Sequence, residues 1–204
     1  MKTLVMFYSM YGHVHRLARA VAEGVAEVDG VEPVLRKVAE TLPDALVEKL
    51  GGAEPRKAWA DVPEVAVSDL LECDAMIIGT PTRFGGVCGQ VRQFLDSTGA
   101  LWARQAMLGK IGAGFTSSGT QHGGQEVTIF GSLYPYFLHH GMLVCGLPYA
   151  YAGQSGMEEI KGGSPYGASC VAASDNSAQP TTFDLDGARY LGRHVATLTK
   201  KLRG

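Results

Sequence analysis

Short apolar runs recur along the chain and predict strands that are buried on both faces of a sheet. These runs occupy residues 3–8, 75–79, 110–115 and 142–145. Runs of this kind are typical of parallel sheets, which helices cover on both sides. Another strand is predicted at residues 31–38, where Pro33 cannot donate a hydrogen bond to a neighbouring strand. Because proline is tolerated mainly at a sheet edge, we expect this to be an edge strand.

Helical spacing of apolar residues separates the predicted strands. The clearest examples are Val14, Leu17, Ala18, Val21, Ala22 and Val25 after the first strand, and Ala188, Leu191, Val195, Leu198 and Leu202 near the C-terminus. Further helices are expected after residue 86, from about residue 125, and over a short stretch at residues 43–50. Pro135 should kink or end the helix that begins near residue 125, because a proline inside a helix removes a backbone hydrogen bond.

The alternation of strands and helices predicts an α/β fold. It indicates a doubly wound, five-stranded parallel sheet with helices on both faces. The edge position of the second strand favours the strand order 2-1-3-4-5. Residues 1–204 are interpreted as a single domain, since 204 residues is within the usual range of one. Residues 146–182 show little periodicity, and a long irregular loop of this kind usually serves a function or an interface.

Composition and charge exclude several classes of protein. Apolar residues make up 46% and charged residues 19% of the chain, which suits a packed core and excludes disorder. A net charge of −2 provides no overall field for nucleic acid or an acidic membrane. No apolar run approaches the roughly 20 residues of a membrane helix or serves as a signal peptide, so a cytoplasmic location is expected. The four cysteines lack metal-ligand spacing, so buried thiols and no metal are expected.

Loops rich in glycine and hydroxyl groups follow the first, third and fourth strands. Ligands bind at the carboxyl ends of strands in an open parallel sheet, and the loop at residues 9–14 also precedes a helix whose free N–H groups suit a phosphate. An equally good alternative is that Ser9 only caps this helix. The chain contains no Walker loop, and no GxGxxG follows the first strand. A phosphate loop built on hydroxyls without lysine suits a monophosphate joined to a flat ring, namely flavin mononucleotide (FMN).

Several short motifs follow one another along essentially the whole chain. They are Ser9-Met10-Tyr11-Gly12-His13, Gly79-Thr80-Pro81-Thr82-Arg83-Phe84, Gly89-Gln90, Phe94-Leu95-Asp96, Gly123-Gly124-Gln125-Glu126, His139-His140-Gly141-Met142 and Pro165-Tyr166-Gly167-Ala168. In order and approximate spacing they resemble the WrbA family of flavodoxin-like NAD(P)H:quinone oxidoreductases. The resemblance implies a flavodoxin-like fold, FMN as cofactor, NADH or NADPH as co-substrate, a small-molecule quinone as substrate, and a cytoplasmic homotetramer.

The resemblance also implies roles for individual residues. The FMN phosphate would be held by Ser9, Met10, Tyr11, Gly12, His13 and Val14. The isoalloxazine ring would be lined by Thr82, Arg83, Phe84, Ser117, Ser118, Gly119, Thr120, Gln121 and His122. Tyr11, Trp102 and His139 would border the nicotinamide or quinone, and His139 would also contact the cofactor.

Ordinary structural roles compete with these assignments at single positions. Without the resemblance, Arg83 could be a solvated surface charge, Trp102 a core residue, and the pair His139-His140 part of a packed helix face. The position of Arg83 after a buried strand favours a role in a flavin loop, and the resemblance favours the functional interpretation of Trp102. Metal binding by the histidines is disfavoured because no partner ligands lie at a useful spacing.

The reaction that the resemblance implies is a ping-pong transfer of two electrons from NAD(P)H through flavin N5 to a quinone. The flavin would carry the redox chemistry, so no catalytic side chain is assigned, and proton donation by His139 is a hypothesis. One alternative is a flavodoxin-type one-electron carrier that docks on redox proteins, although a net charge of −2 gives it little steering. Another is an interaction protein without flavin. The sequence does not choose between NADH and NADPH.

Overall fold

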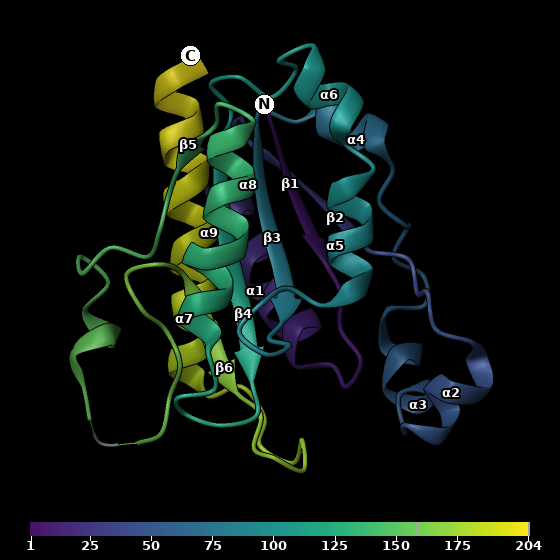
Figure 1. Cartoon of the computed structure of the whole chain (residues 1–204). Coiled ribbons are helices and arrows are strands. Elements are labelled where there is room, and N and C mark those ends of the chain that lie inside the picture. The colour runs from purple at the N-terminus through teal and green to yellow at the C-terminus, as the bar shows by residue number, and fades with distance from the viewer. Residues whose placement is uncertain (158, 204) are drawn as a thin grey trace.

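Within residues 1–157 and 159–203, which the computed structural model describes, a six-stranded parallel sheet forms the centre of the molecule (Figure 1). The strands are β1 (Lys2–Phe7), β2 (Glu32–Lys37), β3 (Ala75–Pro81), β4 (Ile111–Ser118), β5 (Leu143–Val144) and β6 (Ala168–Val171). Their order is β2-β1-β3-β4-β5, and β6 also pairs with β4. The predicted order is therefore confirmed, and β2, which carries Pro33, lies at the edge beside β1.

The strand position beside β4 is shared by two short strands. One edge of β4 pairs with β3 from Ile111 to Ser117, so β5 and β6 both lie along the opposite edge. β5 pairs with the start of β4, and β6 pairs with its last four residues. The five predicted strands are thus joined by a sixth, and residues 146–182 are not irregular throughout, because β6 lies within them. Strand β6 was not predicted because its four residues include a serine and form no continuous apolar run.

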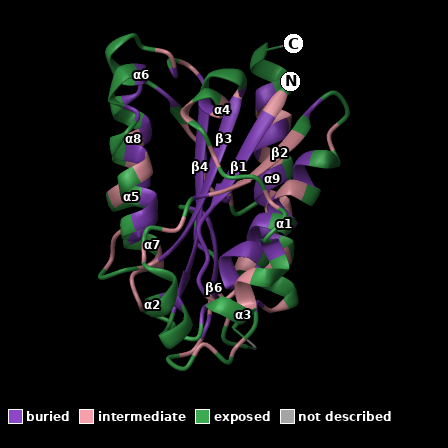
Figure 2. Ribbon diagram, turned by 90° about the vertical axis from the view of Figure 1, so that its right-hand side faces the viewer, coloured by how far each residue is buried: buried purple, intermediate pink, exposed green. Residues whose placement is uncertain are grey.

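Helices cover both faces of the sheet (Figures 1 and 2). The main ones are α1 (His13–Ala26), α4 (Val67–Glu72), α5 (Gly89–Asp96), α8 (Tyr134–His139) and α9 (Thr182–Arg203). Helices α1 and α9 enclose one half of the core with Val5 and Phe7 of β1, whereas α4, α5 and α8 enclose the other half with Leu4 and Met6. None of the helices in the described part of the chain is both long and apolar enough to cross a bilayer.

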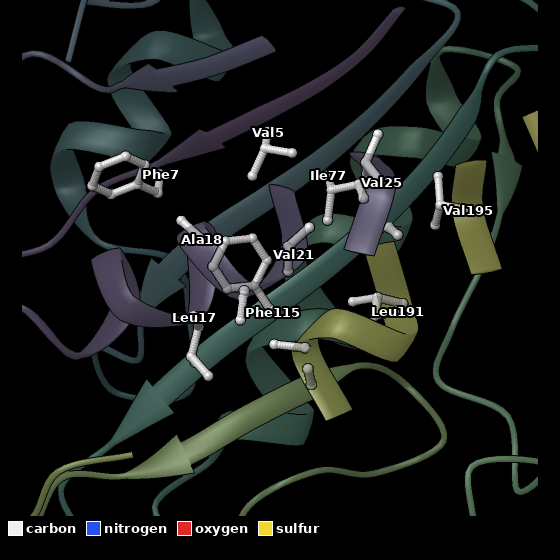
Figure 3. Packing of buried hydrophobic residues seen from close by; sticks show 14 of the residues in the cluster. Val5, Phe7, Leu17, Ala18, Val21, Val25, Ile77, Phe115, Leu191 and Val195 are labelled. Carbon is white, nitrogen blue, oxygen red and sulfur yellow. The ribbon is translucent and has the colours of Figure 1, made fainter. Parts of the chain in front are cut away.

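Helices α1 and α9 are in direct backbone contact. A Cβ atom on Gly24 of α1 would meet the carbonyl oxygen of Arg189, and one on Gly192 of α9 would meet the carbonyl oxygen of Val21. Leu191 and Val21 are fully buried around this crossing (Figure 3). The two glycines therefore permit a close approach that brings α9 onto the same face of the sheet as α1.

Shorter helical segments complete the fold. They are α2 (Asp44–Lys49), α3 (Ala53–Arg56), η1 (Lys57–Trp59), α6 (Gly99–Ala103), α7 (Gln125–Thr128), η2 (Ile129–Leu133) and η3 (Ala152–Ser155). Pro135 was expected to kink or end the helix that begins at Gln125, but this helix passes through the π-helical turn η2 and continues as α8. Pro135 lies in the first turn of α8, where its missing N–H costs little. The regular α-helical pattern is therefore interrupted by η2, before the proline, and the proline does not end the helix.

Candidate functional site

The carboxyl ends of β1, β3, β4 and β6 lie at one end of the sheet, toward which the arrowheads of Figure 1 point. A small cavity lies there, at the end of the sheet where open parallel sheets bind their ligands. Its lining residues are Ser9, Met10, Tyr11, His13, Val14, Pro81, Thr82, Arg83, Ser117, Ser118, Gly119, Ala172 and Asn176. The structure thus brings together most of the residues that the sequence assigned to FMN.

The loop after β1 leaves the amino end of α1 free for an anion. Gly12 precedes the helix with a left-handed φ of 99°, and no side chain in the described part of the protein caps the helix. Ser9 Oγ accepts a hydrogen bond of 3.1 Å from the N–H of Gly12, one residue before the helix begins. The alternative in which Ser9 only caps α1 is therefore wrong. The first N–H groups of α1 and the positive end of its dipole remain available to a phosphate.

His13, the first residue of α1, supplies a buried polar atom without a partner. Its side chain lines the cavity and is 4% exposed, and among the described residues nothing forms a hydrogen bond with its Nε2. Burial lowers the pKa of His13, although the carbonyl groups of Ala178 and Asn176 oppose this shift. Buried polar atoms are normally paired, so this orphan fits a site that a polar ligand completes.

A tight turn after β3 forms the opposite wall of the cavity. The N–H of Thr82 donates to the carbonyl oxygen of Ser117 at 2.8 Å, and Arg83 and Gly86 exchange two backbone hydrogen bonds of 2.9 Å. Phe84, at the tip of the turn, has a left-handed φ of 51° and a fully exposed side chain. The turn is therefore fixed by its backbone, with Arg83 at the cavity and Phe84 directed to solvent.

The loop after β4 contributes only its first part to the cavity. Ser117, Ser118 and Gly119 line it, whereas Thr120, Gln121 and His122 are exposed and lie outside its lining. The Ser118 hydroxyl donates to the carbonyl oxygen of Thr120 at 2.6 Å, so it stabilises the loop. Within one chain, Thr120, Gln121 and His122 therefore do not reach the cavity.

Trp102 and His139 lie at the other end of the sheet. The end of α8 is next to the start of β4, because the N–H of Gly109 donates to the carbonyl oxygen of Gly141 at 2.9 Å. Trp102 and His139 border a separate hollow there, and both are exposed. The eight residues of β4 separate this hollow from the cavity, a span of roughly 25 Å at the usual rise per residue.

His140, next to His139, is the packed member of the pair. It is buried, its Nε2 lies 3.3 Å from Thr98 Oγ1, and its ring packs against Tyr136 with a centroid distance of 4.6 Å. His140 is therefore part of a packed helix face, which was the alternative for the histidine pair. His139 is exposed and remains available for contacts outside this chain.

Sequence reasoning missed residues from two segments. Ala172 and Asn176 follow β6 and line the cavity, but no strand was predicted before them. Thr128 is fully buried, and its hydroxyl lies 3.1 Å from Thr82 Oγ1 and 3.0 Å from the carbonyl oxygen of Gly124. It therefore joins the loops that follow β3 and β4. The sequence analysis identified the nearby motif Gly123-Gly124-Gln125-Glu126 but assigned no role to Thr128.

The sheet order and the cavity beyond its carboxyl ends define a flavodoxin-like protein with a site for a phosphate-bearing ligand. The chain belongs to the family described as NADPH-dependent FMN reductase, whose model matches residues 2–156. This membership agrees with the expected ligands, FMN and a nicotinamide nucleotide.

Full-length relatives and solved structures agree with this assignment. A protein of Geobacter metallireducens named NAD(P)H dehydrogenase (quinone) is 55% identical over 204 residues, which cover all of both chains. One of the same name from Syntrophus aciditrophicus is 56% identical over 202 residues, or 99% of each chain. The flavodoxin, WrbA-like protein from Agrobacterium tumefaciens has a TM-score of 0.68 and 25% identity over 98% of each chain. The resemblance inferred from the motifs is thereby confirmed.

Proposed function

We propose that this chain catalyses the two-electron reduction of quinones by NAD(P)H, with FMN as cofactor and in ping-pong order. One observation carries the proposal: the uncapped amino end of α1 opens into a cavity lined by hydroxyls and a rigid turn. The relatives named NAD(P)H dehydrogenase (quinone) support the same reaction. Residues 1–204 would form one FMN-binding domain of a cytoplasmic enzyme.

The cavity fits the phosphate of the cofactor at its α1 end. There the free N–H groups of the helix, the Gly12 backbone and the orphaned Nε2 of His13 lie together. Among the described residues that line the cavity, Arg83 is the only cation and no carboxylate is present. The electrostatic environment therefore favours an anion.

The turn after β3 would position the ring of the cofactor. Bound FMN supplies hydride acceptance and donation. The guanidinium group of Arg83 donates to the carbonyl oxygen of Thr82 at 3.1 Å, which holds it over the turn. From there it would stabilise negative charge that develops at the reacting end of the cavity.

A second copy of the chain would complete the substrate site. Trp102 and His139 border a hollow about one strand length from the cavity, so neither can reach a ligand bound in the cavity of its own chain. We therefore assign their contacts with quinone or nicotinamide to a neighbouring subunit of a homotetramer. Tyr11 lines the cavity in the same chain and would border the nicotinamide from that side.

The proposal is tested by NADH oxidation with 1,4-benzoquinone, with and without added FMN. We expect turnover that depends on FMN and parallel lines in plots of reciprocal rate, as ping-pong order requires. Bound flavin without quinone turnover would support the one-electron carrier instead. Failure to bind flavin would contradict both functions.

A pair of arginine variants tests the role of the turn. Arg83→Met should lower kcat/KM for benzoquinone about 10-fold or more, because the charge at the cavity is lost. The matched control is Arg92→Met, since Arg92 is exposed and pairs with Asp96 on α5. Equal activity of the two variants would contradict the assignment of Arg83.

A further inference from the structure

The turn that follows β6 contributes to the lining of the cavity. β6 pairs with the end of β4, and the N–H of Ala172 donates to the carbonyl oxygen of Ser118 at 2.8 Å. The chain therefore leaves the sheet beside Gly119. From this turn, Ala172 and Asn176 join the residues that line the cavity.

Backbone and neighbouring side chains hold the turn without using the Asn176 amide. The N–H of Ala178 donates to the carbonyl oxygen of Ala172 at 3.1 Å. The N–H of Asn176 donates to the carbonyl oxygen of Ala173 at 3.2 Å. Among the described residues, no hydrogen bond involves the side chain of Asn176. Its left-handed φ of 61° is a conformation that asparagine tolerates. The side-chain amide of this cavity-lining residue is therefore free to bind a ligand.

Asn176 lies near the α1 end of the cavity. The backbone carbonyl groups of Asn176 and Ala178 are near enough to His13, the first residue of α1, to oppose the lowering of its pKa. His13 is nine-tenths buried, and its Nε2 lacks a partner in the described part of the chain. Asp175, the acidic residue of the turn, accepts hydrogen bonds from Ser177 and does not line the cavity.

We propose that Asn176 binds the phosphate group of the flavin cofactor, with its amide N–H opposite the amino end of α1. This inference rests on the proposed function, and it names a residue that selects the phosphorylated flavin. An amide suits this position because it donates hydrogen bonds to phosphate oxygens and adds no negative charge. The phosphate would then be enclosed from two sides, by α1 and by the turn after β6.

Binding of FMN and of riboflavin, which lacks the phosphate, tests the inference. The dissociation constants of both flavins are measured by flavin fluorescence for the wild type, Asn176→Asp, Asn176→Gly and Gln179→Glu. Gln179→Glu is the matched control, since it makes the same amide-to-carboxylate change at an exposed position of the same segment. Both replacements at position 176 are compatible with the left-handed backbone.

We expect Asn176→Gly to weaken FMN binding about 10-fold, and Asn176→Asp to weaken it more, because a carboxylate repels the phosphate. Riboflavin binding should change less than about twofold in both variants, and Gln179→Glu should leave both flavins unaffected.

Equal weakening of FMN and riboflavin by both replacements would overturn the inference, because it would indicate a role in the shape of the turn. Unchanged FMN binding in Asn176→Asp would overturn it as well, while the proposed function would stand. A wild type that binds neither flavin would remove the proposed function and this inference together.

Discussion

His15 illustrates how a buried position changes the chemistry of a single residue. Its ring packs against Trp59, with a centroid distance of 4.9 Å, and against Phe7 at 5.4 Å. Burial, with Arg19 and Arg16 nearby, lowers the pKa of His15 to about 4. The spacing of apolar residues places Val14 and Leu17 in the helix core, but it gives no sign that His15 is buried too. Its burial depends on Trp59, which approaches from a distant segment.

The shifted pKa of His15 predicts a pH-dependent stability. Between the ordinary histidine pKa of about 6.5 and the folded value, the unfolded chain binds more protons, so the free energy of unfolding falls as the pH is lowered. The loss should be complete below about pH 4, and we expect His15 to account for about 3 kcal/mol of it.

Urea unfolding at a series of pH values measures this effect. His15→Phe keeps an aromatic ring between Trp59 and Phe7, and it should flatten the profile between pH 6.5 and 4. The control is His122→Gln, at an exposed histidine. An equally steep profile in His15→Phe would show that other groups, such as His13, dominate the titration.

At the scale of elements, the pattern of apolar residues predicted most strands and helices. It located β1 to β5, the edge position of β2 and the start of the helix at Gln125. It missed β6, and it did not predict the π-helical turn ahead of Pro135. Both depend on long-range packing: β6 forms because the end of β4 needs a partner, and η2 packs Ile129 and Leu133 against Gly114 of β4.

The crossing of α1 and α9 gives a prediction at this scale. Gly24→Ala places a Cβ against the carbonyl oxygen of Arg189, so the helices must separate. We expect a loss of about 1–3 kcal/mol in the free energy of unfolding, measured by urea denaturation. Gly99→Ala in α6 is the control, because its Cβ would meet nothing within 4 Å. It should change stability by less than about 1 kcal/mol. Equal effects would contradict the close-contact explanation.

At the scale of the whole molecule, the placement of Trp102 and His139 is the main result for function. The resemblance assigned them to the same site as Ser9 and Arg83, yet the sheet separates the two groups. No pattern within the sequence distinguishes a residue that serves its own chain from one that serves a neighbour. The distinction depends on which end of the sheet each helix reaches.

Complementation between two inactive variants tests this arrangement. Trp102→Ala and Arg83→Ala should each have low quinone reductase activity, and co-expression should restore part of it, because some sites receive both native residues. Mixed oligomers are isolated with two affinity tags and assayed with NADH and benzoquinone. Trp102→Ala should still bind FMN. Activity no higher than that of the separate variants would contradict a site built from two chains.

The sequence by itself determined the alternation of strands and helices, the edge position of β2 and the loop that precedes α1. These features are local: continuous apolar runs form buried strands, periodic ones form helices, and a glycine in the left-handed region precedes a free helix terminus. Only the tertiary structure decided that β6 pairs with β4, that Asn176 reaches the cavity, and that Trp102 lies at the opposite end. These features depend on segments far apart in the chain, whose contacts no local pattern encodes.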